Sequence, residues 1–256
     1  MHKAALQAGR RVDSITLLGV TKGQRAAAVR AAAAAGVRDF GESYLQEALE
    51  KIAAVQELAG RGQPSAAGGL VAPQQSPAPR TGPAAPGAST AAPQPELTWH
   101  FIGRLQSNKT RPIAETFAWV HAVDRLKIAE RLAEQRPYYA PPLNVCLQVN
   151  VAGEGSKGGV GFAELPALAA AVAALPRLKL RGLMCLPPEE HDPARQRHWF
   201  RKVREALDGL NGSGMGLDTL SMGMSTDLEA AILEGATIVR IGTALFGPRA
   251  PARGMG

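Results

Sequence analysis

The sequence predicts an α/β fold, a single closed (β/α)8 barrel, from two observations. Strand-like and helix-like segments alternate along the chain, which is typical of parallel strands joined by helical crossovers. Eight such units suit a chain of 256 residues. The alternative, an open doubly wound sheet, usually carries a G-x-G-x-x-G turn after its first strand. The turn from Val20 to Gln24 lacks this motif, so we favour the barrel.

The first half of the chain contains four strand-like segments. Ser14–Lys22 (SITLLGVTK) is short, β-branched and apolar, as a buried strand is. An alanine-rich segment follows, and Gly36 would end it as a helix C-cap glycine. The predicted strands are Ser14–Lys22, Val37–Glu42, Leu97–Gly103 and Ala118–Val123, and the predicted helices are Gln24–Ala35, Tyr44–Leu58, Asn108–Thr116 and Arg125–Gln135.

The second half repeats the same order of elements. Asn144–Asn150 (NVCLQVN) and Thr237–Leu245 (TIVRIGTAL) are apolar and β-branched. Ser225 is the expected N-cap of the last helix. The predicted strands are Asn144–Asn150, Leu178–Leu186, Asp218–Met222 and Thr237–Leu245, and the predicted helices are Phe162–Leu175, Pro193–Leu210 and Thr226–Glu234.

Residues 59–95 differ from the rest of the chain in composition. They consist mainly of Ala, Pro, Gly, Ser and Gln, with almost no large apolar side chains. Such a segment cannot bury enough surface to offset the entropy of ordering. We therefore expect residues 1–58 and 96–256 to form the barrel and residues 59–95 to be a disordered insertion.

Charge and cysteine usage exclude several classes of protein. The formal net charge is +7, but no run of five or six like charges occurs and aromatic residues make up only 5%, so we expect no nucleic-acid partner. No apolar run is long enough to span a membrane and no leader pattern is present, so we expect a cytoplasmic protein. Cys146 and Cys185 lie in separate apolar runs and are expected to be buried thiols, not a disulfide or a metal pair.

Barrel active sites lie where strands end, and the first strand ends in Lys22. An amine among apolar groups loses stabilisation of its charge and becomes nucleophilic toward carbonyls. A surface lysine that extends from the strand end is the alternative.

The last two strands suggest a phosphate site. Barrels often bind phosphate there through loop N–H groups, and Ser225 and Gly242 suit such loops; ordinary capping and a tight turn are the alternative. Arg240 alternates with the apolar Val239 and Ile241, so it would point inward and need a partner. A structural ion pair with a neighbouring carboxylate is the alternative to a role in binding. His100 is expected to be a satisfied core histidine.

Taken together, several segments resemble the YggS/PROSC group of pyridoxal-phosphate homeostasis proteins, which are similar to the N-terminal barrel domain of alanine racemase. The resemblance covers nearly the whole chain except the insertion, and its longest motifs are specific. The matching segments are Leu17–Lys22, Phe40–Lys51, Trp99–Lys109, Ser156–Gly158, Arg181–Leu186, Leu220–Ile232 and Val239–Gly247.

The resemblance implies pyridoxal 5'-phosphate (PLP) as the cofactor, held in a PLP-binding barrel of the alanine racemase N-terminal type. It implies a Schiff base on Lys22 and an arginine, Arg240, that faces the pyridine nitrogen. The other cofactor-binding positions that it implies are Ser221, Ser225, Gly242 and Thr243 at the phosphate and His100 and Met222 in the pocket. Ser43 stands where the family usually has Asn, and only a short helix, near His2–Gly9, precedes the first strand, so the barrel floor is expected to be less well covered.

Three functions are compatible with these residues. A guanidinium only donates hydrogen bonds, so a ring nitrogen that faces Arg240 stays unprotonated and the ring is a poor electron sink. The resemblance therefore favours a PLP carrier and regulator of vitamin B6 and amino-acid pools, without catalytic residues, over a small racemase-like PLP enzyme. A cofactor-free Schiff-base aldolase that uses Lys22 is the third. We expect a monomer that binds PLP, with PLP-dependent apoenzymes as protein partners and no membrane association.

Overall fold

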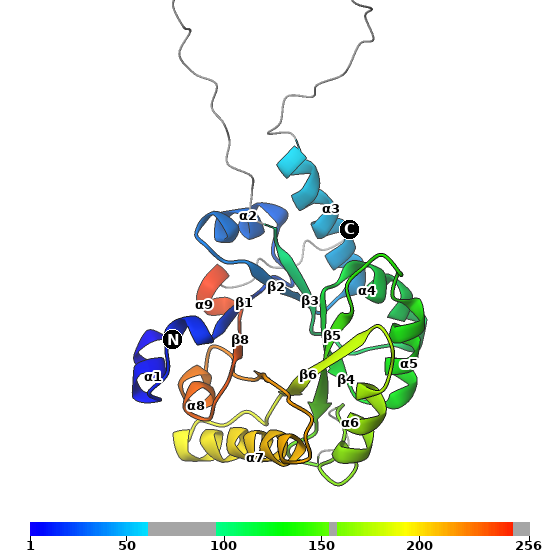
Figure 1. Ribbon diagram of the computed structural model, residues 1–256. Helices are drawn as coiled ribbons and strands as arrows, with labels where there is room; N and C mark the ends of the chain where they lie inside the picture. The colour runs from blue at the N-terminus through cyan, green and yellow to red at the C-terminus, as the bar shows by residue number, and fades with distance from the viewer. Residues whose placement is uncertain (61–95, 154–157, 248–256) are drawn as a thin grey trace, which may run out of the picture.

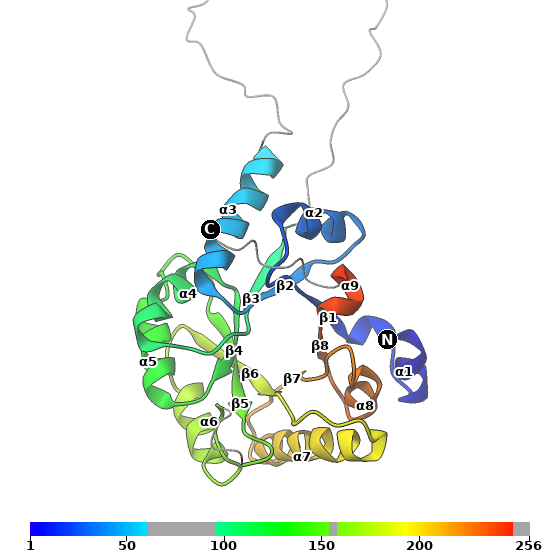
Figure 2. The same ribbon diagram turned by 180° about the vertical axis from the view of Figure 1, so that it is seen from behind.

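The computed structural model describes residues 1–60, 96–153 and 158–247, and it confirms the predicted barrel. Eight parallel strands pair in chain order, and the last pairs with the first, so the sheet is closed. Figures 1 and 2 show the strands at the centre with helices around them. The strands are β1 (Thr16–Val20), β2 (Asp39–Glu42), β3 (Thr98–Phe101), β4 (Trp119–Val123), β5 (Leu143–Val149), β6 (Leu178–Cys185), β7 (Thr219–Ser221) and β8 (Ile238–Ile241).

Helices connect the strands and cover the outside of the barrel. The short helix α1 precedes the barrel and lies against α8 (Figure 1). Its buried alanines, Ala4 and Ala5, permit this close packing. The α-helices are α1 (His2–Gln7), α2 (Ala26–Ala34), α3 (Leu45–Gly60), α4 (Thr110–Thr116), α5 (Leu126–Gln135), α6 (Leu165–Ala173), α7 (Pro193–Gly212), α8 (Leu228–Leu233) and α9 (Thr243–Phe246).

Several predicted element ends differ from the structure, and the first strand, expected to end at Lys22, ends at Val20. The last strand was expected to run to Leu245, but the backbone leaves the extended conformation at Gly242 (φ −109°, ψ −82°) and turns into α9. Helix α8 begins at Leu228 with Asp227 at its N-cap, not at Ser225. The Asp227 carboxylate accepts the N–H of Met224 at 2.5 Å, which folds the intervening residues into a turn instead of helix.

Helix α3 continues to Gly60, two residues beyond its predicted end. The remainder of the expected insertion, residues 61–95, lies outside the described residues, as do residues 154–157 with Ser156 and Lys157 of the matching segment. No helix among the residues that the structure describes is long and apolar enough to cross a membrane.

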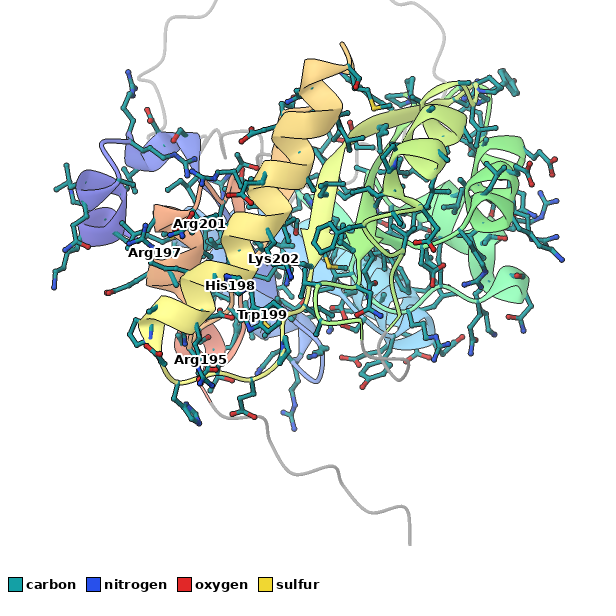
Figure 3. All side chains as sticks on the ribbon, turned by 90° about the horizontal axis from the view of Figure 1, so that it is seen from below. Arg195, Arg197, His198, Trp199, Arg201 and Lys202 are labelled. Atoms are coloured by element: carbon teal, nitrogen blue, oxygen red, sulfur yellow. The ribbon has the colours of Figure 1, made fainter. Side chains whose placement is uncertain are left out.

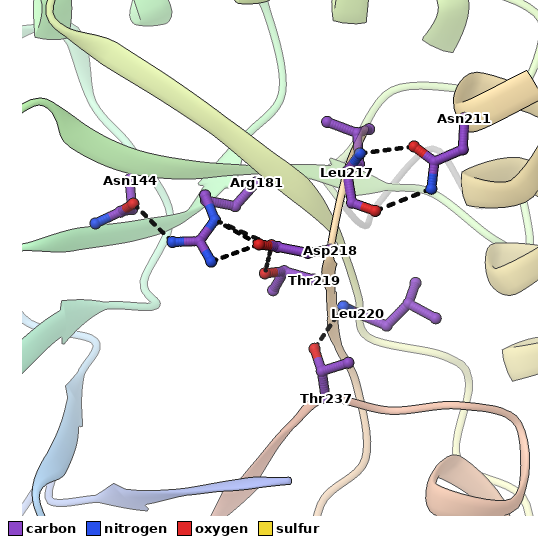
Figure 4. Close-up of polar contacts among 8 residues, drawn as sticks. All are labelled: Asn144, Arg181, Asn211, Leu217, Asp218, Thr219, Leu220 and Thr237. Carbon is purple, nitrogen blue, oxygen red and sulfur yellow. Dashed lines mark hydrogen bonds and ion pairs between the residues drawn. The ribbon is translucent and has the colours of Figure 1, made fainter. Parts of the chain in front are cut away.

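Polar side chains from neighbouring strands meet near the N-terminal ends of β5 and β7 (Figure 4). The Arg181 guanidinium lies 4.8 Å above the Trp119 ring and pairs with the Asp218 carboxylate, with Nε to Oδ1 at 3.0 Å and Nη2 to Oδ2 at 2.6 Å. Its Nη1 donates to Asn144 Oδ1 at 3.1 Å. Trp119 in turn stacks on His100, with ring centroids 5.4 Å apart. These contacts lie at the end of the barrel that the short N-terminal helix was expected to cover less well.

Helix α7 carries four arginines and one lysine, several of which are labelled in Figure 3. Arg197, Arg201 and Arg204 extend toward α8 and reach the buried carboxylate of Glu234 at 2.8, 3.2 and 3.5 Å. On the other side of the helix, the Lys202 ammonium lies 5.3 Å from the centre of the Trp199 ring. Much of the charge of α7 therefore serves helix packing.

Candidate functional site

Lys22 lies at the mouth of the barrel, just beyond the C-terminal end of β1. The ladder continues past the strand, since the Thr21 N–H donates to the Gly41 carbonyl at 3.0 Å. Leu18 pairs in register with Arg240, and alternation along the chain then directs Val20 and Lys22 to the inner face as well. Lys22 is half-buried, and among the described residues its side chain has no hydrogen-bond or ion-pair partner. Its amine is therefore available at the mouth.

Arg240 is a buried cation, and the groups that accept its side-chain hydrogen bonds are all neutral. Its Nη1 donates to the Ser221 carbonyl at 2.6 Å and to Ser221 Oγ at 3.0 Å, and its Nη2 donates to the Cys185 carbonyl at 2.8 Å. Burial lowers the pKa of the guanidinium from its ordinary value. No carboxylate among the described residues forms an ion pair with it, so the structural ion pair considered from the sequence is absent there. The nearby Asp227 carboxylate opposes this lowering of the pKa from a distance, without an ion pair. A buried charge that no carboxylate contacts directly is costly and favours an added acceptor or anion.

A chain of hydrogen bonds runs from Arg240 through the barrel toward the floor. Ser221 Oγ lies 2.8 Å from His121 Nδ1, and His121 Nε2 lies 2.9 Å from His100 Nδ1. His100 Nε2 then lies 3.0 Å from Asp39 Oδ1, at the start of β2. Five residues from five strands therefore form one connected polar network inside the barrel.

The Asp39 carboxylate and two neutral histidine rings set the direction of these hydrogen bonds. The Asp39 carboxylate can only accept, so His100 donates to it from Nε2, and the Nδ1 of a neutral His100 then accepts from His121 Nε2. The remaining nitrogen of a neutral His121, Nδ1, accepts from Ser221 Oγ, which in turn accepts from Arg240. Burial lowers the pKa of His100, and burial and the nearby His100 and Arg240 lower the pKa of His121, which agrees with neutral rings.

The loop after β7 passes close to α8. Gly223 has a φ of +92°, and a Cβ on it would lie 2.5 Å from the Ala231 Cβ, so only glycine fits there. Its carbonyl accepts the Arg240 N–H at 3.0 Å, which ties the loop to β8. Met222 is fully buried, whereas Ser225 is exposed on the turn before α8.

The loop after β8 presents free backbone donors. Gly242 packs beside Val20, since a Cβ on it would lie 3.6 Å from the Val20 Cβ. The N–H groups of Thr243 and Ala244, in the first turn of α9, have no acceptor among the described residues. Such groups are the usual donors to phosphate oxygens in barrels.

The structure brings together some of the predicted site residues and leaves others apart. Ser221, Arg240 and His100 belong to the single polar network in the barrel, with His100 toward the floor. Ser43 is half-buried after β2, and its backbone carbonyl packs tightly against Gly103.

Sequence reasoning missed His121 and Asp39. His121 alternates with apolar neighbours in β4, as Arg240 does in β8, and that pattern could have identified it. The described residues contain no group of three or more side chains that could hold a metal ion.

Comparisons with known proteins agree with this geometry. Residues 7–250 match the family described as alanine racemase, N-terminal domain. A protein of Pseudomonas aeruginosa PAO1 named pyridoxal phosphate homeostasis protein is 54% identical over 97% of this chain and 91% of its own length. A protein of Escherichia coli K12 with the same name is 47% identical over 96% of this chain and 91% of its own.

Solved structures show the same fold. PipY of Synechococcus elongatus PCC7942, solved with PLP bound, has a TM-score of 0.73 and 33% sequence identity over 96% of this chain and 98% of its own. Alanine racemase of Corynebacterium glutamicum has a TM-score of 0.59 at 17% identity, over 98% of this chain and 60% of its own, and shares the fold alone. The barrel therefore also occurs as one part of a longer enzyme chain.

Proposed function

Since the chain belongs to the alanine racemase N-terminal domain family and, within it, to the pyridoxal phosphate homeostasis proteins, we propose that it binds PLP as a Schiff base on Lys22. The observation that carries this proposal is the buried guanidinium of Arg240. It lies inside the barrel below the mouth with neutral hydrogen-bond partners, and a pyridine nitrogen is an acceptor that suits it. The half-buried Lys22 amine at the same mouth has no competing partner among the described residues.

The residues of the mouth suit the three functional groups of PLP. Bound PLP would supply an aldehyde, and attack by the Lys22 amine with loss of water would form the Schiff base. The free N–H groups after β8, at Thr243 and Ala244, would donate to the phosphate, together with Gly242 and the loop that contains Ser225. Ser43, His100, Met222 and Ser221 complete the proposed set, with Ser221 acting on the cofactor through Arg240.

We propose a carrier of PLP, without strong catalysis, because of how Arg240 is held. Its hydrogen bonds to Ser221 and Cys185 hold the guanidinium in place, and it would donate a hydrogen bond to the ring nitrogen without transferring the proton. An unprotonated ring withdraws electrons weakly, so carbanion chemistry is disfavoured. Release of PLP to apoenzymes would suit such a protein. A small racemase-like enzyme is the second candidate, because the fold is shared with alanine racemase.

Borohydride trapping tests the proposal. Protein with PLP should be yellow, and reduction followed by peptide mapping should find the cofactor on Lys22. Lys22→Ala should lose the colour and the covalent attachment but keep its fold, whereas the exposed Lys127→Ala should behave as the parent. A Lys22→Ala protein that stays yellow would refute the assignment. Racemisation of L-alanine by the parent protein would favour the enzyme instead.

A further inference from the structure

A buried ionic cluster lies on the outer side of the barrel beside the mouth. Its centre is the Lys51 ammonium of α3, which donates to the Thr21 carbonyl at 2.5 Å, to Glu42 Oε1 at 2.5 Å and to Glu47 Oε1 at 2.9 Å. We refer to Thr21, Glu42, Glu47 and Lys51 as the Lys51 cluster. It joins β1, β2 and α3, and none of its members was among the predicted site residues.

The cluster holds the backbone on both sides of Lys22. Before Lys22, the Thr21 carbonyl accepts from the ammonium, and Thr21 Oγ1 donates to Glu42 Oε1 at 2.6 Å. After Lys22, the Gly23 N–H donates to Glu47 Oε1 at 2.5 Å. Lys22 thus lies between two anchored peptide groups, while its own side chain has no partner among the described residues.

The positions of these residues follow from the strand and helix periods. In β2, Gly41 pairs with His100 on the inner face, so Glu42 points outward to the helices. By alternation along the extended chain, Thr21 also points outward, and the next residue, Lys22, points to the inner face. Glu47 and Lys51 lie four positions apart on α3, so they share the helix face that meets these strands.

Stability alone is a weak reason for this arrangement. The side chains of Lys51 and Glu42 are 5% and 0% exposed, and a buried ion pair often stabilises a fold no better than apolar residues would. Burial raises the pKa of Glu42, against the opposing effects of Lys51 and Thr21, and its Oε2 has no partner among the described residues. Such a cluster is better suited to fixing geometry than to adding free energy.

We propose that the Lys51 cluster is a clamp that sets the orientation of Lys22 for attachment of an aldehyde, with Glu47 and Lys51 as positioning residues. This inference rests on the proposed function. Attack on the aldehyde carbon requires the amine at a defined place, and a displacement of about 1 Å can slow such a step roughly a hundredfold. Because Lys22 lacks side-chain partners, its peptide neighbours must supply that precision.

Glu47→Ala tests the clamp, with Glu50→Ala as the matched control. Both carboxylates lie on α3, but Glu50 is exposed, and within the described part of the chain it accepts a hydrogen bond only from Gln46. Glu47→Ala should slow the rise of yellow absorbance after addition of PLP by roughly tenfold or more. Pyridoxine 5'-phosphate, which has an alcohol in place of the aldehyde, should bind both variants and the parent equally. Hydrogen exchange of the Gly23 amide should be faster in Glu47→Ala than in the parent, and it should be unchanged in Glu50→Ala.

The outcomes separate the clamp from the proposed function. Attachment at the parent rate in Glu47→Ala would overturn the clamp, and so would an equal loss of affinity for PLP and for the alcohol, because a general structural defect would weaken both. Lys51→Met with the parent's unfolding midpoint should attach as slowly as Glu47→Ala. A parent protein that attaches PLP elsewhere than Lys22 would instead refute the proposed function.

Discussion

Gly223, in the loop after β7, provides a sharp test of the geometry at the barrel mouth. Alanine there would have to adopt a φ of +92° and place its Cβ 2.5 Å from the Ala231 Cβ. Gly214 has a nearly equal φ of +88° but nothing within 4 Å of the added Cβ. Gly214→Ala therefore measures the backbone strain alone, about 1–2 kcal/mol. Gly223→Ala adds overpacking, for a further ~1–3 kcal/mol.

Urea unfolding of the two variants would measure this difference. Adding Ala231→Gly to Gly223→Ala removes the clashing methyl group, so the double variant should recover the overpacking share of the loss and show a favourable coupling energy. Equal destabilisation by Gly223→Ala and Gly214→Ala, or absence of coupling with position 231, would refute the close contact. Because the same loop precedes the exposed Ser225, Gly223→Ala should also weaken retention of PLP.

Three further predictions concern buried groups. Burial lowers the pKa of His100 and His121 below the ordinary 6.5, so their contribution to stability is complete above about pH 6.5 and is lost as the pH falls below it. The urea midpoint of unfolding should therefore fall on acidification, and it should fall less in His121→Gln. Burial raises the pKa of the Cys146 and Cys185 thiols to about 12, so iodoacetamide at about pH 8 should label neither in the folded protein and both in urea. Arg136 donates to three backbone carbonyls at 2.6–2.8 Å, so Arg136→Met should lower the unfolding free energy by about 2–4 kcal/mol, measured with urea.

The sequence pattern predicts the barrel and the strand that leads to Lys22 because both depend on local periodicity. The inward direction of Arg240 follows in the same way from its apolar neighbours in β8. Its partners do not follow, because Ser221 and the Cys185 carbonyl come from other strands, and their distances depend on register. The partners of His121 do not follow from the sequence pattern either, since Ser221, which lies within hydrogen-bond distance of it, is 100 positions away along the chain.

Element ends were the least predictable features, for a reason that Asp227 illustrates. Ser225 and Asp227 are both good N-cap residues, so the sequence pattern cannot choose between them. The choice falls to Asp227 because its carboxylate bonds back to Met224 N. The Lys51 cluster was missed because lysine and glutamate separated by four residues on a helix usually form a solvent-exposed pair. Here β1 and β2 cover that pair.

The hydrogen-bond chain through the barrel gives its long axis an electrical polarity. A permanent positive charge, Arg240, lies at one end of the chain, and a carboxylate, Asp39, lies at the other, with neutral rings between them. Every hydrogen in the chain is donated in the same sense, from mouth to floor. A ligand that enters the mouth approaches the positive end first, so the barrel should attract anions over cations of similar shape. Added salt should weaken this preference.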